Sequence, residues 1–426
     1  MEGSGLGFRH FTRSLPNGAR IRQKFPTAYI QDPRGEVREK LLAAGLRGKI
    51  SPGSQVAITA GSRGIGGFVA LVSGIADAIK AAGGKPFIVP AMGSHGGATA
   101  EGQTELLRRL GLTEDSVGAP IHSSMETIEF GASQNGAIAH IDRRAAEADG
   151  IIVLGGVKAH PENRVGIASG LLKMTAVGLG KQAGAQQAHS HGLWDSVKAV
   201  PRLTLARAKV LFGVAVVQNA YHQPALIEVV APVYEAFREA DERLLKAAEP
   251  HAGKLPFTQL DLLIVDELGK DISGTGMDLN VIGKWRVEGG KREPDFFRIV
   301  ALSLTHGSLG NGLGIGLADF TTERFTREFD PAATYVNLLT ACEPGTMITR
   351  EGVVPLALPS DREAIEVGLH SSLAGSEPRI CRIKSTARLD EFWASEALLK
   401  EVAEHPDLTV LGEPSQLEFD ARGNLF

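Results

Sequence analysis

The sequence has few of the features that mark specialised classes of protein. Its 426 residues include only two cysteines, Cys342 and Cys381, which excludes a disulfide scaffold and a cage of thiolate metal ligands. The formal net charge is −4, so we do not expect the basic surface that nucleic-acid binding requires. No apolar run reaches membrane-spanning length and no signal-peptide pattern opens the sequence, so we expect no membrane partner and a cytoplasmic location.

Glycine, in contrast, is abundant. There are 51 glycines in a chain that is otherwise ordinary for a globular protein, with 43% hydrophobic and 22% charged residues. Many of them follow short apolar runs, and glycine lets a backbone approach a ligand closely. The clusters are Gly61–Gly67, Gly93–Gly97, Gly155–Gly156 and Gly307–Gly316. Ligands of α/β proteins usually bind where a strand ends in such a segment.

Apolar runs alternate with helical patterns along the chain. This alternation predicts an α/β protein with two α/β domains, mainly parallel sheets and a cleft between the domains. We expect domains at 1–253 and 254–426, with a C-terminal tail that could pack back on the first domain. The expected strands are Val56–Thr59, Pro86–Pro90, Gly150–Leu154, Val210–Val217, Leu262–Asp266 and Ile299–Leu304. The expected helices are Phe68–Ala82, Ala225–Ala247, Pro331–Ala341, Asp361–Leu373 and Leu389–Glu404.

The segment ITAGSRGIGG is similar to the nucleotide-binding turn of short-chain dehydrogenases. Two observations weigh against that chemistry. Ala60 replaces one expected glycine, and no tyrosine in the chain is followed by a lysine four residues later. That tyrosine–lysine pair supplies the general acid of those enzymes, so a dehydrogenase is disfavoured.

Three polar side chains follow three expected strands. Arg63 lies in a turn where a guanidinium could hold a carboxylate or phosphate, and His95 lies between glycines in GSHGG. His160 follows Gly150–Leu154 in the same manner. Because the carboxyl ends of parallel strands share one edge of a sheet, we expect these three side chains to converge.

The stretch Val157–His191 adds a lysine and a pair of histidines. Lys173 lies in the apolar SGLLKMTAVGLG, where partial burial would make its amine nucleophilic. His189 and His191 are two residues apart, so on a helix they point in different directions and we expect only one of them to be a ligand. In the second domain Asp278, Asn280 and Lys284 surround turns after Leu262–Asp266 and could contact a substrate.

The ordered set of motifs resembles that of the nickel-dependent lactate racemase superfamily. The motifs are Arg63 in GSR, His95 in GSHGGAT, His160 in KAH, Lys173 in SGLLK and His189 in QAHSHG. The resemblance implies a nickel-pincer nucleotide, a pyridinium-3-thioamide-5-thiocarboxylic acid mononucleotide that holds nickel, with Lys173 as its tether and His189 as the nickel ligand. His95 and His160 would be the acid and base, and Arg63 would hold the substrate carboxylate. Gly61, Ser62 and Gly93 would lie against the cofactor.

The resemblance thus implies a racemase or epimerase with a small-molecule carboxylate substrate and cofactor-synthesis proteins as partners. Ala60 stands where the family turn begins with Asp, so we expect a 2-hydroxy acid other than lactate or a sugar acid. Two alternatives stay open: a non-catalytic protein that binds a carboxylate or phosphate metabolite, and a hydrolase or lyase with a histidine-ligated metal. The oligomeric state and the identity of the substrate also stay open.

Overall fold

The computed structural model describes residues 11–62, 65–158, 169–289, 291–342 and 348–426, and it divides into two compact units. Unit 2 comprises Pro26–Ala252 and Val336–Thr346, and unit 1 comprises Met1–Phe25, Gly253–Tyr335 and Met347–Phe426. The expected first domain instead began at residue 1. The difference arises because strand β1 (Gly18–Gln23) pairs with strands near the C-terminus of the chain, and the C-terminal tail likewise belongs to unit 1.

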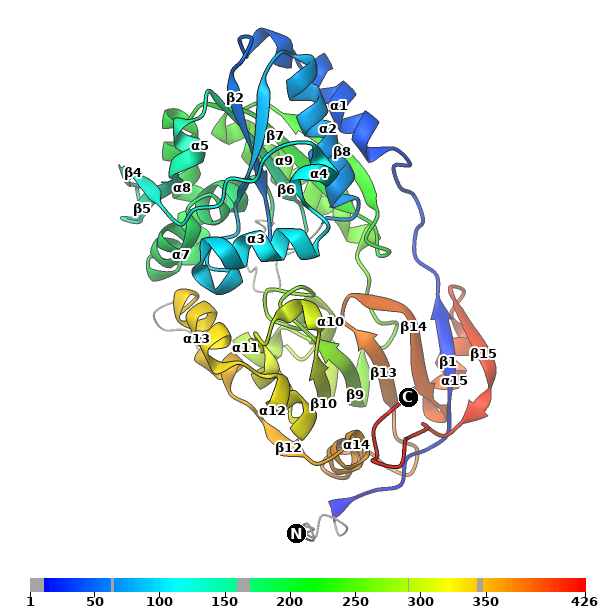
Figure 1. The fold of residues 1–426 in the computed structure, drawn as a ribbon. Helices are drawn as coiled ribbons and strands as arrows, with labels where there is room; N and C mark the ends of the chain where they lie inside the picture. The colour runs from blue at the N-terminus through cyan, green and yellow to red at the C-terminus, as the bar shows by residue number, and fades with distance from the viewer. Residues whose placement is uncertain (1–10, 63–64, 159–168, 290, 343–347) are drawn as a thin grey trace. The chain divides into compact units, whose positions relative to one another are not determined.

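Unit 2 is built on a five-stranded sheet in the order β3-β2-β6-β7-β8, of which the first four strands are parallel (Figure 1). Its strands are β2 (Gln55–Ala60), β3 (Lys85–Pro90), β6 (Gly150–Gly156), β7 (Val210–Gln218) and β8 (Pro224–Val230), and a separate hairpin joins β4 (Thr127–Ala132) to β5 (Ile138–Asp142). Its helices are α1 (Pro33–Ala43), α2 (Phe68–Ala81), α3 (Ala100–Arg109), α4 (Glu114–Val117), α5 (Arg143–Glu147), α6 (Leu171–Lys173), the π-helix η4 (Met174–Gly178), α7 (Lys181–Ser190), α8 (Leu193–Arg207) and α9 (Tyr234–Ala248).

The central strands of unit 2 are apolar throughout because helices cover both faces of their sheet. Residues that alternate along β6 point to opposite sides: Ile151 and Val153 belong to one apolar cluster, and Ile152 and Leu154 to the other. The first cluster includes residues of α6, α8 and α9, and the second includes residues of α1 and α2. The result is a three-layer α/β/α unit.

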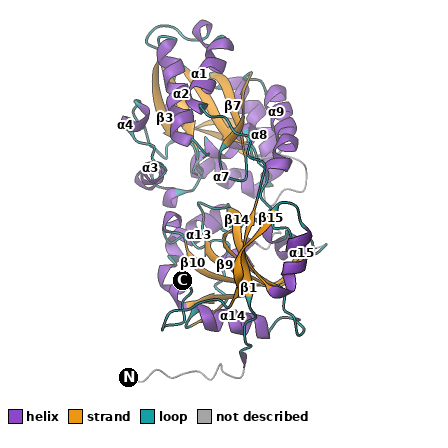
Figure 2. Ribbon diagram, turned by 90° about the vertical axis from the view of Figure 1, so that its right-hand side faces the viewer, coloured by secondary structure: helices purple, strands orange, loops and turns teal. Residues whose placement is uncertain are grey.

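Unit 1 contains an eight-stranded sheet in the order β12-β11-β10-β9-β13-β14-β1-β15 (Figure 2). Strands β9 to β13 run parallel, whereas β14, β1 and β15 add antiparallel pairs at one end. Besides β1, the strands are β9 (Gln259–Leu268), β10 (Asp295–Leu304), β11 (Phe320–Thr322), β12 (Leu356–Leu358), β13 (Ile380–Ser385), β14 (Arg388–Ser395) and β15 (Leu408–Ser415). The helices are α10 (Leu279–Ile282), α11 (Trp285–Glu288), α12 (Glu323–Glu328), α14 (Asp361–His370) and α15 (Leu399–Glu404), while α13 (Pro331–Thr340) includes residues of both units.

The prediction of an α/β fold with mainly parallel sheets is confirmed, but two expected helices are wrong in part. The start of Ala225–Ala247 belongs to strand β8, which ends at Val230, and the first half of Leu389–Glu404 belongs to strand β14. Strand β8 pairs antiparallel with the strongly apolar β7, and β14 pairs antiparallel with β13 and with the distant β1. This pairing overrides a periodicity that is also compatible with a helix.

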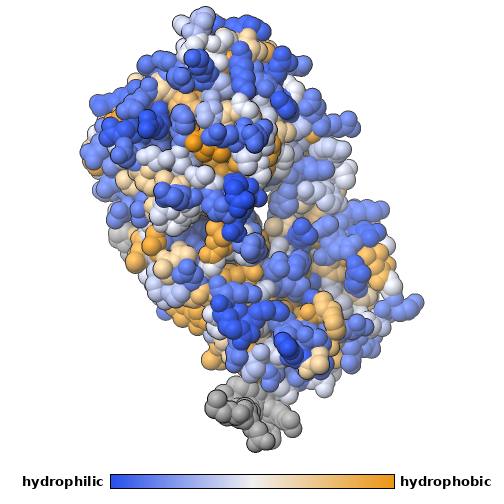
Figure 3. Space-filling view, in the orientation of Figure 1, coloured by the Kyte–Doolittle hydropathy of each residue, from blue (hydrophilic) through white to orange (hydrophobic). Residues whose placement is uncertain are grey.

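None of the helices in the part of the chain described is both long and apolar enough to cross a bilayer. On the face shown in Figure 3, hydrophobic residues lie scattered among hydrophilic ones, which is the usual pattern of a protein surface.

Candidate functional site

The candidate site lies at the carboxyl edge of the unit 2 sheet. Strands β2 and β3 end side by side, with Ala60 opposite Pro90, and the amide of Ala91 donates to the carbonyl of Ala60 over 2.7 Å. The segments that begin at Gly61 and Ala91 therefore start next to each other. After β6, Lys158 and Ser169 exchange two backbone hydrogen bonds, which close the base of the segment between them.

His95 lies half-buried in the segment that follows β3. Its amide donates to the carbonyl of Met92 over 3.2 Å, and its own carbonyl accepts from Gln103 Nε2 over 3.2 Å. Gly93 has φ of 58°, a conformation that favours glycine, and its amide donates to Gly178 over 3.4 Å. A Cβ at Gly93 would lie 3.4 Å from Ala185 Cβ, so this segment packs closely on η4 and α7.

Lys173 ends the short helix α6 and is followed at once by the π-helix η4. Such π turns are rare and often occur at functional sites. The side chain is half-buried, and Nζ lies 5.7 Å from the ring centroid of Trp194, within cation–π distance. The next residue, Met174, brings its Cε to 3.3 Å from where a Cβ of Gly61 would be, so Lys173 belongs to a segment that packs against the end of β2.

A buried carboxylate from another helix caps α6. Asp241 on α9 accepts hydrogen bonds from the amides of Leu171 and Leu172, each over 2.9 Å. A Cβ at Gly170 would be 2.2 Å from Asp241 Oδ1, so only glycine leaves room for this contact. Burial raises the pKa of Asp241 to about 7, against the opposing effect of the two amide donors.

The two histidines of the HSH motif have different environments. His189 is half-buried in the last turn of α7, whereas His191 lies past the helix end and is exposed. His191 Nδ1 is 3.0 Å from the carbonyl of Gln187, and its ring is 3.4 Å from where a Cβ of Gly136 would be, in the turn between β4 and β5. The two histidines thus differ in exposure and in their place relative to the end of α7.

Two predicted site residues, Arg63 and His160, lie outside the described residues. Their flanking residues show where their segments begin and end. Ser62 is half-buried just past the end of β2, and Lys158 pairs with Ser169 just past β6. The described neighbours of both residues thus lie at the carboxyl edge of the same sheet.

The predicted substrate contacts of the second domain belong to unit 1. Asp278 caps α10: its Oδ1 accepts from the amide of Asn280 over 2.9 Å and from Asn280 Nδ2 over 2.8 Å. Lys284 immediately precedes α11 and is half-buried. Asp278 is thus the N-cap of α10, and Asn280 supplies the hydrogen bonds that it accepts. The roles of Asp278, Asn280 and Lys284 toward a substrate remain predictions.

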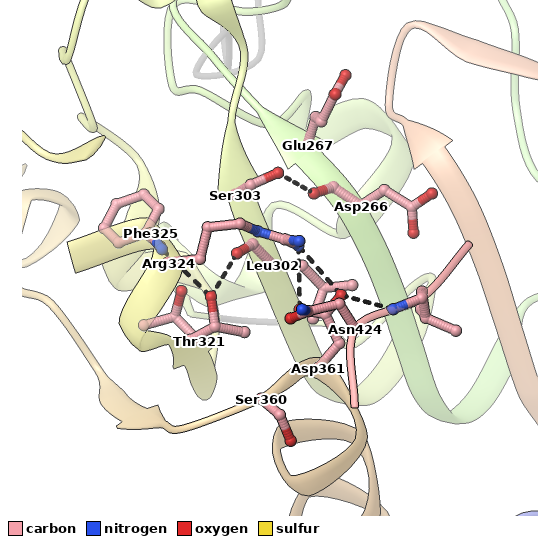
Figure 4. A network of polar contacts seen from close by, with 12 residues as sticks. Asp266, Glu267, Leu302, Ser303, Thr321, Arg324, Phe325, Ser360, Asp361 and Asn424 are labelled. Carbon is pink, nitrogen blue, oxygen red and sulfur yellow. Dashed lines mark hydrogen bonds and ion pairs between the residues drawn. The ribbon is translucent and has the colours of Figure 1, made fainter. Parts of the chain in front are cut away.

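The carboxyl edge of the unit 1 sheet holds a network of polar side chains that bond to one another (Figure 4). Both carboxylate oxygens of Asp361 accept from Arg324 Nη2, over 3.0 and 3.1 Å, and Oδ2 also accepts from the amide of Leu425 over 3.0 Å. Ser303 Oγ donates to the carbonyl of Asp266 over 2.8 Å, and the Asp266 carboxylate pairs with Arg382. These polar groups hold strand ends and the C-terminal segment together.

Several buried polar residues of unit 2 were not anticipated, among them Gln103, Lys181 and Asp241. Asp241 had a detectable signal, because it falls on the apolar stripe of α9 with Phe237 and Leu244. Gln103 likewise shares the buried face of α3 with Leu107. Lys181 shares the buried face of α7 with Gly184, Ala185 and Ala188, but these small residues do not make a strongly apolar stripe, so the pattern offers little reason to expect a buried lysine.

The described residues contain no group of three or more histidine, cysteine, aspartate or glutamate side chains that could hold a metal ion. Within those residues, a cage made wholly of protein ligands is therefore absent. Of the two predicted cofactor contacts, Lys173 ends α6 and His189 lies in the last turn of α7, with the π-helix η4 between the two helices.

Comparisons with known proteins place the chain in context. Residues 68–283 match the family model described as "Domain of unknown function (DUF362)". No curated protein matches the chain. Among solved structures, the lactate racemase apoprotein from Thermoanaerobacterium thermosaccharolyticum is similar with a TM-score of 0.51 and 13% sequence identity, over 87% of this chain and 99% of that chain. This likeness shows a shared fold.

Proposed function

The chain belongs to the DUF362 family, and we propose that it acts as a racemase or epimerase of a 2-hydroxy acid or sugar acid. The observation that supports this proposal most directly is the packing of the Lys173 segment against the ends of β2 and β3. The fold shared with a lactate racemase apoprotein supports it as well. The finer steps of the proposal, from cofactor to substrate, rest on the motif resemblance.

The proposed cofactor is the nickel-pincer pyridinium nucleotide, tethered through the amine of Lys173, with His189 as the protein ligand to nickel. When bound, this group supplies an acceptor for hydride from the substrate carbon. The residues fit such a group: Lys173 is half-buried beside Trp194, and Gly61 and Gly93 place backbone without side chains at the same edge. A lysine amine is a group that can form such a covalent tether.

The chain's own side chains would move the proton and hold the substrate. His95 and His160 would take and return the proton of the substrate hydroxyl, each working on one stereoisomer. Arg63 would hold the carboxylate through a two-point contact, so that the carbon centre can invert without losing the substrate. Asp278, Asn280 and Lys284 are the proposed substrate contacts from unit 1, and cofactor-synthesis proteins of the cytoplasm are the proposed partners.

The first test measures intact mass and metal content of natively produced protein. We expect nickel together with a mass increment that maps to the peptide bearing Lys173. Lys173→Ala should abolish the increment, whereas the control Lys198→Ala, which removes an exposed lysine on α8, should retain it.

Three outcomes would contradict this proposal. An increment that persists in Lys173→Ala would remove the tether role from Lys173. Protein without metal or increment would favour a metabolite-binding function on the same fold. Zinc without an increment would favour a metal-dependent hydrolase or lyase.

A further inference from the structure

A fully buried glutamine supports the segment that bears His95. Gln103, on α3, donates from Nε2 to the carbonyl of Gly93 over 2.9 Å and to the carbonyl of His95 over 3.2 Å. Its Oε1 accepts from Lys181 Nζ over 3.2 Å. Both amide hydrogens and the amide oxygen are thus used, and the side chain is 0% exposed.

Lys181 is the buried cation beneath this glutamine. Its Nζ donates to the carbonyl of Pro90, the last residue of β3, and to Gln103, and it lies 3.1 Å from Asp142 Oδ2. Neither side chain of the Lys181–Asp142 pair is exposed. Burial lowers the pKa of Lys181, while the Asp142 carboxylate opposes that change.

The backbone of Lys181 is as constrained as its side chain. It adopts φ of 55°, which is uncommon for a residue other than glycine, at the first position of α7. The unusual backbone is stabilised by the three partners of the ammonium group. Lys181 therefore ties the start of α7, the helix of His189, to the end of β3 and to α3.

Close backbone contacts complete the support of the His95 segment. A Cβ at Gly102 would lie 2.0 Å from the carbonyl oxygen of Gly96, and a Cβ at Gly96 would lie 2.6 Å from the amide of Gln103. On the other side, Ser94 Oγ accepts from Asn337 Nδ2 over 3.0 Å, within unit 2. Gln103 thus bonds to the carbonyl of His95, and Asn337 bonds to the side chain of the preceding residue, Ser94.

An apolar side chain would fill the same space at a lower cost of desolvation. A buried amide costs free energy unless every donor and acceptor has a partner, and here each partner has a defined direction. Such an amide fixes the location of the groups that it bonds to more than it adds to the net stability of the fold. The position that it defines is that of His95 relative to the start of α7.

We propose that Gln103, anchored by Lys181, is a positioning residue that sets the location of His95 for proton transfer. The proposal rests on the proposed function in so far as His95 is taken to move the hydroxyl proton of the substrate. The contact by which Gln103 positions His95 is a property of the protein alone. The positioning role and the proton transfer can therefore be tested separately.

The test replaces Gln103 in the full-length protein. Gln103→Glu keeps an oxygen toward Lys181 but places a second oxygen against the carbonyls of Gly93 and His95, and Gln103→Leu removes all three contacts without adding a charge. Glu105→Gln is the control: it removes the ion pairs of Glu105 with Arg108 and Arg109 on the same helix. The readouts are amide hydrogen exchange over residues 91–98 and the titration of the His95 imidazole by NMR in ¹³C-histidine-labelled protein, assigned with His95→Gln.

We expect exchange over residues 91–98 to rise about tenfold or more in both variants, and the His95 pKa to move by about half a unit or more. Glu105→Gln should change neither. In the racemisation assay kcat should fall on the order of 100-fold with little change in KM, because a small displacement of a catalytic group has an effect of that size.

Unchanged exchange and an unchanged His95 titration in a folded Gln103 variant would overturn the positioning role. Gln103→Leu provides the measurement if Gln103→Glu does not fold. Another result would contradict the proposed function and not the positioning role. If His95 responds as expected but the native protein contains no nickel and has no racemase activity, the positioning contact stands and the reaction assigned to the site is wrong.

Discussion

The two units place different groups at the carboxyl edges of similar sheets. In unit 1, Asp361 and Arg324 bond to each other at this edge, and the C-terminal segment adds the amide of Leu425 (Figure 4). In unit 2, glycines and the half-buried His95 and Lys173 lie near this edge, and the buried Lys181 contacts Gln103, Asp142 and the carbonyl of Pro90 at the end of β3.

This difference indicates separate roles for the two edges. The salt bridge of unit 1 uses both of its side chains in contacts within the protein. In unit 2 the buried Lys181–Asp142 pair connects the start of α7 to the end of β5. Because neither side chain of the Lys181–Asp142 pair is exposed, water is less able to replace a lost partner there than at the partly exposed Arg324–Asp361 pair.

The largest effect is expected from Lys181→Met. The substitution leaves the Asp142 carboxylate buried without its cation, so we expect the free energy of unfolding to fall by about 3–5 kcal/mol. Urea unfolding measures this change. The double variant Lys181→Met, Asp142→Asn should recover part of the loss, and no recovery would mean that the pair does not act as a unit.

A smaller effect is expected from Arg324→Met in unit 1. Asp361 would lose both contacts from Arg324 but retain the amide of Leu425, and water can reach the site because Arg324 is 35% exposed. We expect a loss of about 2 kcal/mol in the same unfolding experiment. A loss equal to that of Lys181→Met would remove the proposed distinction between the two edges.

The smallest effect, when it is measured over a single pH unit, is the change in stability that follows from the protonation of Asp241. Its pKa is raised from 3.8 to about 7 in the folded protein, so between these values the folded state binds a proton that the unfolded state has released. The contribution to stability is therefore complete below about pH 4 and is lost as the pH rises through 7, at up to about 1.4 kcal/mol per pH unit. Asp241→Asn should lack this decline. A difference between wild type and variant that is independent of pH would contradict a protonated Asp241.

Much of the fold was predictable because apolar runs and glycine-rich turns are local signals. The runs at Val56–Thr59 and Gly150–Leu154 are the central strands of unit 2, and their continuous hydrophobicity follows from helices on both faces. Strands β8 and β14 were missed because their identity depends on antiparallel partners. The exchange of β1 into unit 1 was missed for the same reason, since a pairing across more than half of the chain leaves no local pattern.

Part of the candidate site was likewise predictable from the sequence, and part was not. The glycines that follow β2 and β3, and the position of His95 after β3, could be read from residue order because parallel strands end at one edge. The supporting residues could not. Lys181 reads as a surface lysine, and its burial depends on Asp142, Gln103 and the carbonyl of Pro90, which come from three other elements.

The sequence by itself determined where strands of unit 2 end and which chemically versatile side chains follow them, because strand length and glycine position are encoded within a few residues. Only the tertiary structure decided which polar groups are buried together beneath that edge. The free energy of a buried charge or amide depends on partners far apart in the chain, and no local pattern specifies them.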